Sequence, residues 1–116
     1  MNQSRIIKAD ELAGELAAGN VTEFWNVLTD DYFTDELIPG SRRVPLDRVG
    51  REAAGLPKDT AIVVYCSGLS CPQSKSAGEK LGALGFTNFR VFEGGLEAWK
   101  DSGRAVETAT VDSSRR

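Results

Sequence analysis

Histidine is absent from this sequence of 116 residues, and cysteine occurs only twice, as Cys66 and Cys71. The absence of histidine excludes a cysteine–histidine catalytic pair, so a reactive thiol would have to be activated mainly by the backbone. It also excludes a zinc site, because two cysteines alone cannot complete a tetrahedral ligand set. Two cysteines are too few for the disulfide framework of a small secreted domain, which favours a cytoplasmic protein with reduced thiols.

Long apolar runs and basic clusters are absent as well. No stretch approaches the length of a membrane-spanning helix, and the first residues lack the charged-then-apolar pattern of a signal peptide. The net charge of −3, without a basic cluster, argues against nucleic-acid binding. We therefore expect neither a membrane nor a nucleic acid as a partner. The length fits one domain, placed at residues 5–108, with a flexible C-terminal tail at residues 109–116.

What the sequence does contain is an alternation of strand-like and helix-like segments. Short apolar runs predict strands, and apolar residues three or four positions apart in polar segments predict helices. Strands are expected at residues 5–7, 21–28, 43–45, 61–65 and 89–92. Helices are expected at residues 10–18, 47–54, 70–84 and 96–101, with one helical turn at 31–35. This order predicts an α/β fold with a central, mostly parallel five-stranded sheet and helices on both faces.

Cys66 directly follows the apolar run 61–65 and precedes a short polar loop and a helix. Ligands of parallel α/β sheets bind at the carboxyl ends of strands, where this thiol is expected. The N–H groups of the loop and the partial positive charge of a helix N-terminus favour a thiolate, so we predict a pKa of Cys66 below that of a free thiol. A buried structural cysteine is the alternative, because free cysteines are among the most buried residues.

Three features of the loop favour a nucleophile. Gly68 lets a ligand approach the backbone closely, and the hydroxyls of Ser67 and Ser70 add hydrogen-bond donors. Pro72 suits the first turn of a helix, where its missing N–H costs little, and Ser70 with Gln73 has the spacing of a capping box. A loop of this shape can direct successive N–H groups toward one anion.

Cys71 follows Cys66 by five positions, which is not the spacing of a CxxC redox motif. Two interpretations remain open for Cys71: a small residue at the start of a helix, or a resolving thiol that forms a disulfide with Cys66. The acidic residues between Asp30 and Glu36 match no calcium loop and indicate a solvated surface. The segment 93–95 lacks a phosphate-loop lysine, and we expect no metal and no cofactor.

Several motifs resemble those of the rhodanese-like sulfurtransferases, over nearly the whole chain from residue 6 to residue 106. The segment LIPGS at 37–41 resembles the family's "GHIPGA" signature, and VVYC at 63–66 resembles its catalytic strand and nucleophile. LGALGF at 81–86 and EGGLEAW at 93–99 match its "LxxLGF" and "EGGxxAW" signatures. The resemblance implies a rhodanese-like fold and an enzyme that transfers sulfur.

The resemblance also implies a mechanism, in which a sulfane sulfur is carried as a persulfide on Cys66. The backbone of the loop would cradle this sulfur and an anionic substrate. The residues of this cradle would be Ser67, Gly68, Leu69, Ser70 and Cys71. The partners would be a small sulfur-containing donor and a thiol or protein acceptor.

The active loop departs from the common "CxxGxRS" form of the family. It is about two residues longer, follows the pattern "CxGxxCxxS", and lacks the arginine near its end. Anion attraction then rests on N–H groups and Lys75, so we expect thiosulfate to be a poor donor. The related phosphatases of this fold carry an arginine where Pro72 stands, and phosphatase activity is not expected. Residues 36–37 replace the glycine and histidine of the signature, and Asn26 and Leu28 replace an upstream aspartate and arginine.

The leading hypothesis is a sulfurtransferase that moves a sulfane sulfur through Cys66 to a thiol or another nucleophilic acceptor. A non-catalytic rhodanese-fold module that binds a protein partner is a second hypothesis. A thiol redox protein that cycles a disulfide between Cys66 and Cys71 is a third.

Overall fold

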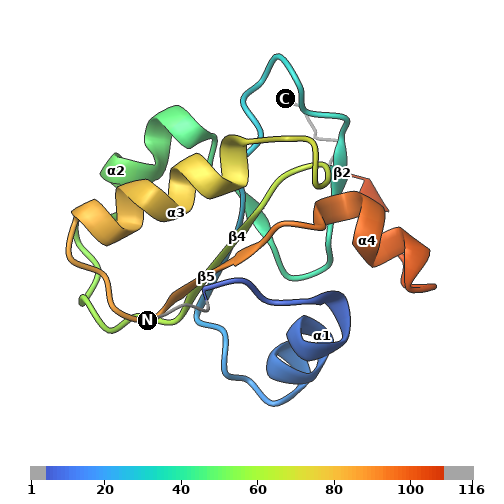
Figure 1. The fold of residues 1–116 in the computed structure, drawn as a ribbon, viewed down its shortest axis with the longest axis horizontal. Helices are drawn as coiled ribbons and strands as arrows, with labels where there is room; N and C mark the ends of the chain where they lie inside the picture. The colour runs from blue at the N-terminus through green and yellow to red at the C-terminus, as the bar shows by residue number, and fades with distance from the viewer. Residues whose placement is uncertain (1–4, 109–116) are drawn as a thin grey trace.

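Four parallel strands form the central sheet of the computed structural model, which describes residues 5–108. The strands are β1 (Glu23–Asn26), β3 (Arg42–Arg43), β4 (Ile62–Tyr65) and β5 (Phe89–Phe92). Their order is β3-β1-β4-β5, and β4 crosses the middle of the molecule (Figure 1). Of the fifth predicted strand, residues 5–7, only one parallel bridge forms, between Ile6 and Val91. The predicted α/β class and parallel sheet are therefore confirmed, with a shorter strand at this edge.

Helices cover both faces of the sheet, as the alternation of its side chains requires. Trp25, Val64 and Val91 belong to the apolar cluster on the face that packs against α2 (Val49–Ala53) and α3 (Gln73–Ala83). Phe24, Val63, Tyr65 and Phe92 belong to a second cluster, with α1 (Ala9–Ala17) and α4 (Gly95–Asp101). Figure 1 shows α2 and α3 side by side, and α1 beyond the opposite side of the strands.

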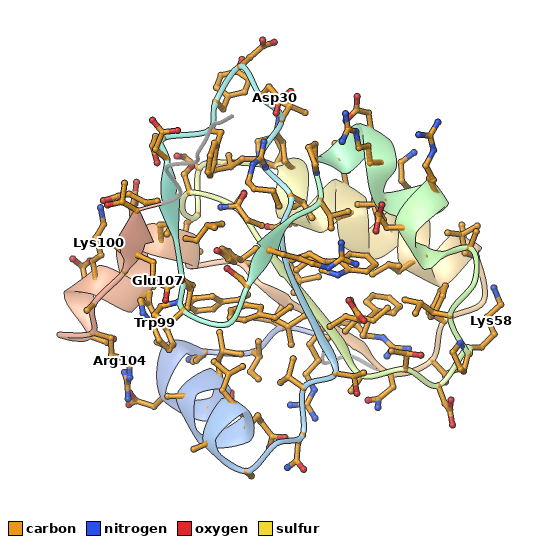
Figure 2. The ribbon with its side chains drawn as sticks, turned by 180° about the vertical axis from the view of Figure 1, so that it is seen from behind. Asp30, Lys58, Trp99, Lys100, Arg104 and Glu107 are labelled. Carbon is orange, nitrogen blue, oxygen red and sulfur yellow. The ribbon has the colours of Figure 1, made fainter. Side chains whose placement is uncertain are left out.

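Contacts beside the second cluster hold the residues that follow α4. Trp99 of α4 donates its indole N–H to the carbonyl oxygen of Ala105 at 2.9 Å. Arg104 lies over the Trp99 ring and pairs with Asp10 of α1 at 3.1 Å (Figure 2). These contacts hold the segment after α4 against α1, so α1 and α4 form one layer.

Several elements differ from the predictions. The predicted helix 47–54 is a short 3-10 helix, Leu46–Arg48, followed by α2, and the predicted helical turn 31–35 is an irregular loop with a turn around residues 30–32. The antiparallel pair β2 (Glu36–Leu37) and β6 (Glu107–Thr108) was not predicted. The predicted tail, residues 109–116, lies outside the described residues. Within residues 5–108, no helix is long and apolar enough to span a membrane.

Candidate functional site

Cys66 follows the last residue of β4 and is completely buried, with 0 % of its surface exposed. The run of β-branched residues before it explains the strand, and the polar residues after it turn the chain toward α3. The Cys66 thiol donates a hydrogen bond to the carbonyl oxygen of Cys71 at 3.3 Å, and its Sγ lies 3.4 Å from the Ser74 hydroxyl. The thiol therefore points into the loop, toward the start of α3.

The first turn of α4 donates backbone hydrogen bonds to the start of the active loop, residues 66–74. The backbone N–H of Leu96 donates to the Cys66 carbonyl at 3.1 Å, and that of Glu97 donates to the Ser67 carbonyl at 2.9 Å. Gly95 has a left-handed φ of 56°, and a Cβ atom on it would collide with the Cys66 carbonyl. Only glycine combines this backbone conformation with so close an approach, which accounts for the second glycine of the EGG motif.

Gly68 packs against an acidic side chain. The carboxylate of Glu97 lies 2.6 Å from the position that a Cβ atom on Gly68 would occupy. The Gly68 carbonyl accepts a hydrogen bond from the Cys71 N–H at 3.1 Å, so this N–H is engaged within the loop. The predicted cradle thus places a negative charge beside the loop and has one N–H fewer to offer an anion.

The predicted low pKa of Cys66 is wrong. Burial raises the pKa of the Cys66 thiol, and its interaction with the Cys71 thiol raises it further, while the Ser74 hydroxyl and N–H act in the opposite direction. The main physical reason is the burial of Cys66, because removal from water disfavours the charged thiolate.

Cys71 is the more acidic of the two thiols. Its partial burial opposes ionisation, but the Cys66 thiol, the N–H groups of Gln73 and Ser67, and the Ser67 hydroxyl outweigh this effect and lower the pKa of Cys71. Hydrogen bonds donated to a thiolate favour the charged form. The activation that the sequence predicted for the first cysteine therefore falls on the second.

A cavity of about 390 Å³ opens beside Cys71. Its lining residues are Leu28, Tyr32, Ser67, Ser70, Cys71, Pro72 and Gln73. Among residues 5–108, Cys66 does not line this cavity, and no lysine or arginine does. Of the predicted cradle, Ser67, Ser70 and Cys71 face this cavity, whereas Gly68 packs toward α4 and Leu69 is 78 % exposed. Lys75 instead lines a different cavity, together with Arg5 and Glu93.

A pair of hydrogen bonds connects the two walls of the Cys71 cavity. The Thr29 N–H donates to Oε1 of Gln73 at 3.0 Å, and Nε2 of Gln73 donates to the Thr29 hydroxyl at 2.9 Å. The predicted capping box of Ser70 and Gln73 is therefore wrong, and α3 starts at Gln73 after Pro72 with no side-chain cap. Leu28 and Tyr32 were not predicted as site residues, because they reach the cavity from a loop that is distant in sequence.

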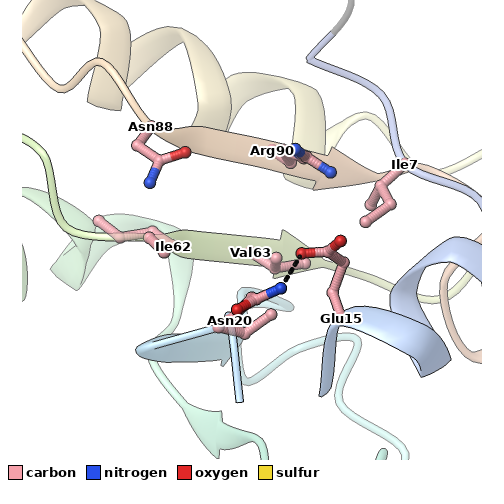
Figure 3. A pocket seen from close by; sticks show the side chains of 9 residues that line it. Ile7, Glu15, Asn20, Ile62, Val63, Asn88 and Arg90 are labelled. Carbon is pink, nitrogen blue, oxygen red and sulfur yellow. Dashed lines mark hydrogen bonds between the residues drawn. The ribbon is translucent and has the colours of Figure 1, made fainter. Parts of the chain in front are cut away.

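A second cavity, of about 270 Å³, lies toward the amino ends of β4 and β5 (Figure 3). Glu15, Asn20, Asn88 and Arg90 are its polar lining residues, and Glu15 accepts a hydrogen bond from Asn20 at 3.1 Å. Neither cysteine lines it. In the described part of the chain, no three histidine, cysteine or acidic side chains gather as metal ligands would.

The comparisons with known proteins agree with this geometry. The family of rhodanese-like domains matches residues 8–102. The "Putative thiosulfate sulfurtransferase SseB" of Mycobacterium tuberculosis is 33% identical over 90 residues, which cover 73% of this chain. The match spans only 31% of that relative, so this chain covers about a third of its length.

Solved structures show the same fold. The Alr3790 protein of Anabaena sp. is 30% identical with a TM-score of 0.76, and the match covers 90% of this chain and 94% of that one. A rhodanese-like domain protein of Staphylococcus aureus is 27% identical with a TM-score of 0.71, over 92% and 100% of the two chains. This chain thus belongs to the rhodanese-like family.

Proposed function

We propose that this protein is a sulfurtransferase that carries a sulfane sulfur as a persulfide on Cys66. The observation that carries the proposal is the placement of Cys66 at the carboxyl end of β4, in a loop held by the N–H groups of Leu96 and Glu97. A fixed thiol at this end of a parallel sheet is suited to covalent catalysis. Transfer of the outer sulfur to an acceptor thiol leaves the Cys66 thiol unchanged, so no cofactor is needed.

The partners in this proposal are a small sulfur donor and a thiol, another nucleophile or a protein as acceptor. In the part of the chain that the structure describes, no lysine or arginine lines the Cys71 cavity, and the Glu97 carboxylate lies beside the loop. A dianion such as thiosulfate would meet repulsion there, so a less charged persulfide is the preferred donor. A reducing compartment such as the cytoplasm suits two unpaired thiols.

The test is turnover with cysteine persulfide as donor and a small thiol as acceptor, in the wild type and in Cys66→Ser. We expect sulfide release from the wild type and a slower release from the variant, with a cooperative thermal unfolding transition in both to show that each is folded. A matched control is Glu15→Gln, at the far cavity, which should turn over like the wild type. Full turnover by Cys66→Ser would contradict the proposal.

A thiol redox function is a second candidate, favoured by the closeness of the two cysteines, since Sγ of Cys66 lies 3.3 Å from the Cys71 carbonyl oxygen. It predicts that mild oxidation forms a disulfide inside the chain and that a reductant restores both thiols. Mass spectrometry with and without reductant measures this. An oxidised protein that holds a disulfide but takes up no sulfur from persulfide would favour redox chemistry over sulfur transfer.

A further inference from the structure

Access to the two thiols is unequal. Cys66 has no exposed surface and does not line the cavity beside the loop, whereas Cys71 is half-buried and forms part of the cavity wall. A donor that enters this cavity meets the sulfur of Cys71 first. The sulfur of Cys66 lies behind it, where it contacts the Cys71 carbonyl and Ser74.

The groups around each sulfur reinforce this difference. Partial burial of Cys71 opposes ionisation, but the Cys66 thiol, the N–H groups of Gln73 and Ser67, and the Ser67 hydroxyl lower the pKa of Cys71. Cys66 faces a carbonyl oxygen, which favours its protonated form. Because the thiolate is the attacking species in sulfur exchange, Cys71 is both the more accessible and the better ionised nucleophile.

We propose that Cys71 is the thiol at which sulfur enters the protein, and that Cys66 receives it from Cys71 in a second step. This inference rests on the proposed sulfurtransferase function and adds a catalytic residue and an order of events to it. In the first step, the Cys71 thiolate attacks the outer sulfur of a small persulfide, R–S–SH. The sulfur–sulfur bond of the donor breaks, RS⁻ leaves, and Cys71 carries –S–SH.

In the second step, the Cys66 thiol gives its proton to the ionised persulfide on Cys71, which becomes Cys71–S–SH. The Cys66 thiolate then attacks the outer sulfur of Cys71–S–SH. The bond between the two sulfurs on Cys71 breaks, Cys71 leaves as a thiolate, and Cys66 carries the persulfide. Each step exchanges one sulfur–sulfur bond for another, so no oxidant or reductant is consumed.

The order distinguishes this role from that of a resolving thiol. A resolving Cys71 would act after Cys66, attack its inner sulfur, release sulfide and leave a disulfide. An entry thiol acts before Cys66 and is needed for the first uptake of sulfur. The single-cysteine variants separate the two roles, because each retains one thiol of the pair.

The experiment follows sulfur uptake from cysteine persulfide by rapid quenching and intact-mass spectrometry, with fragmentation to locate the added atom. Wild type, Cys66→Ser and Cys71→Ser are compared, and Cys66→Ala and Cys71→Ala serve as second variants. We expect Cys66→Ser still to gain one sulfur, which fragmentation locates on Cys71. Cys71→Ser should gain sulfur on Cys66 at least about tenfold more slowly.

Thermal unfolding of each variant establishes that it is folded. Wild-type uptake together with equally fast uptake by Cys71→Ser would overturn the entry role of Cys71 and leave the sulfurtransferase function intact. So would failure of a folded Cys66→Ser to take up sulfur. No uptake by the wild type itself would refute the sulfurtransferase function, and the entry role of Cys71 with it.

Discussion

At the scale of the residue, the two cysteines have opposite electrostatic surroundings. Burial raises the pKa of Cys66, and hydrogen-bond donors lower the pKa of Cys71. The thiolate of Cys71 therefore forms at a lower pH than that of a free cysteine, and the thiolate of Cys66 at a higher pH. We expect iodoacetamide to label Cys71 at neutral pH and Cys66 only in more alkaline solution.

The measurement is the alkylation rate of the Cys66→Ser and Cys71→Ser variants across pH, read by mass. Each variant reports one thiol, and a short cysteine peptide serves as the reference. Faster labelling of Cys66 than of the peptide at neutral pH would show that the loop N–H groups act on Cys66 after all.

This assignment could not be made from the sequence. The pattern of strand, cysteine, loop and helix located the reactive region, and the structure places both thiols there. Which sulfur the N–H groups face depends on the rotation of single peptide units, such as the one whose carbonyl contacts Cys66. Loop residues of this composition accept either rotation, so the sequence carries no signal for it.

Glu97 is the charged side chain that the sequence did not mark as part of the site. Its carboxylate lies beside Gly68, and the substitution Glu97→Gln removes that charge while keeping its size. We expect kcat/KM for thiosulfate to rise about two- to tenfold, a modest gain because the side chain is solvent-screened.

The same variant should use cysteine persulfide, which has less charge, as the wild type does. Glu15→Gln at the far cavity removes the same charge away from the site and is the matched control. An equal gain in both variants would assign the effect to net charge, and no gain in either would exclude repulsion by Glu97.

At the scale of the element, the start of α4 determines the shape of the active loop. An alanine at position 95 would have to adopt a left-handed backbone conformation, and its methyl group would displace the Cys66 carbonyl. We expect Gly95→Ala to lower the free energy of unfolding by about 1–2 kcal/mol from the backbone alone. It should also slow sulfur uptake, because the displaced loop carries both thiols.

Gly103→Ala is the control for that substitution. Gly103 has a similar left-handed φ of 85°, but nothing lies within 4 Å of the position of its Cβ atom. Urea denaturation should show a comparable loss of stability, with the rate of sulfur uptake preserved. Equal loss of uptake in both variants would mean that α4 does not control the loop.

Elements with a clear apolar period were predictable, and those fixed by distant partners were not. β4 consists of apolar residues and β5 is apolar except for Arg90, and both strands form as predicted. β2 and β6 are two residues long and pair across the chain, with no period to reveal them. The position of the turn at residues 38–41 (IPGS) also depends on a distant partner, Tyr65. The Tyr65 hydroxyl lies 2.7 Å from Oγ of Ser41 and accepts a hydrogen bond from the Ile38 N–H.

At the scale of the whole molecule, both cysteines follow one end of the sheet and the net charge is −3. Within residues 5–108, no cationic side chain lines the cavity beside Cys71 to offset that charge. We therefore expect a doubly charged donor to be repelled by the molecule as a whole as well as by Glu97. Salt screens such repulsion over a distance of about 8–10 Å at physiological ionic strength.

We expect the rate of sulfur uptake from thiosulfate to rise a few-fold, roughly two- to fivefold, between low salt and about 0.15 M salt. The rate with cysteine persulfide should change little over the same range, because that donor carries less charge. The reaction of each donor with free cysteine at the same salt concentrations corrects for its intrinsic reactivity. A thiosulfate rate that falls as salt increases would reveal attraction by cations, and would show that the electrostatic field at the loop is positive despite the acidic chain.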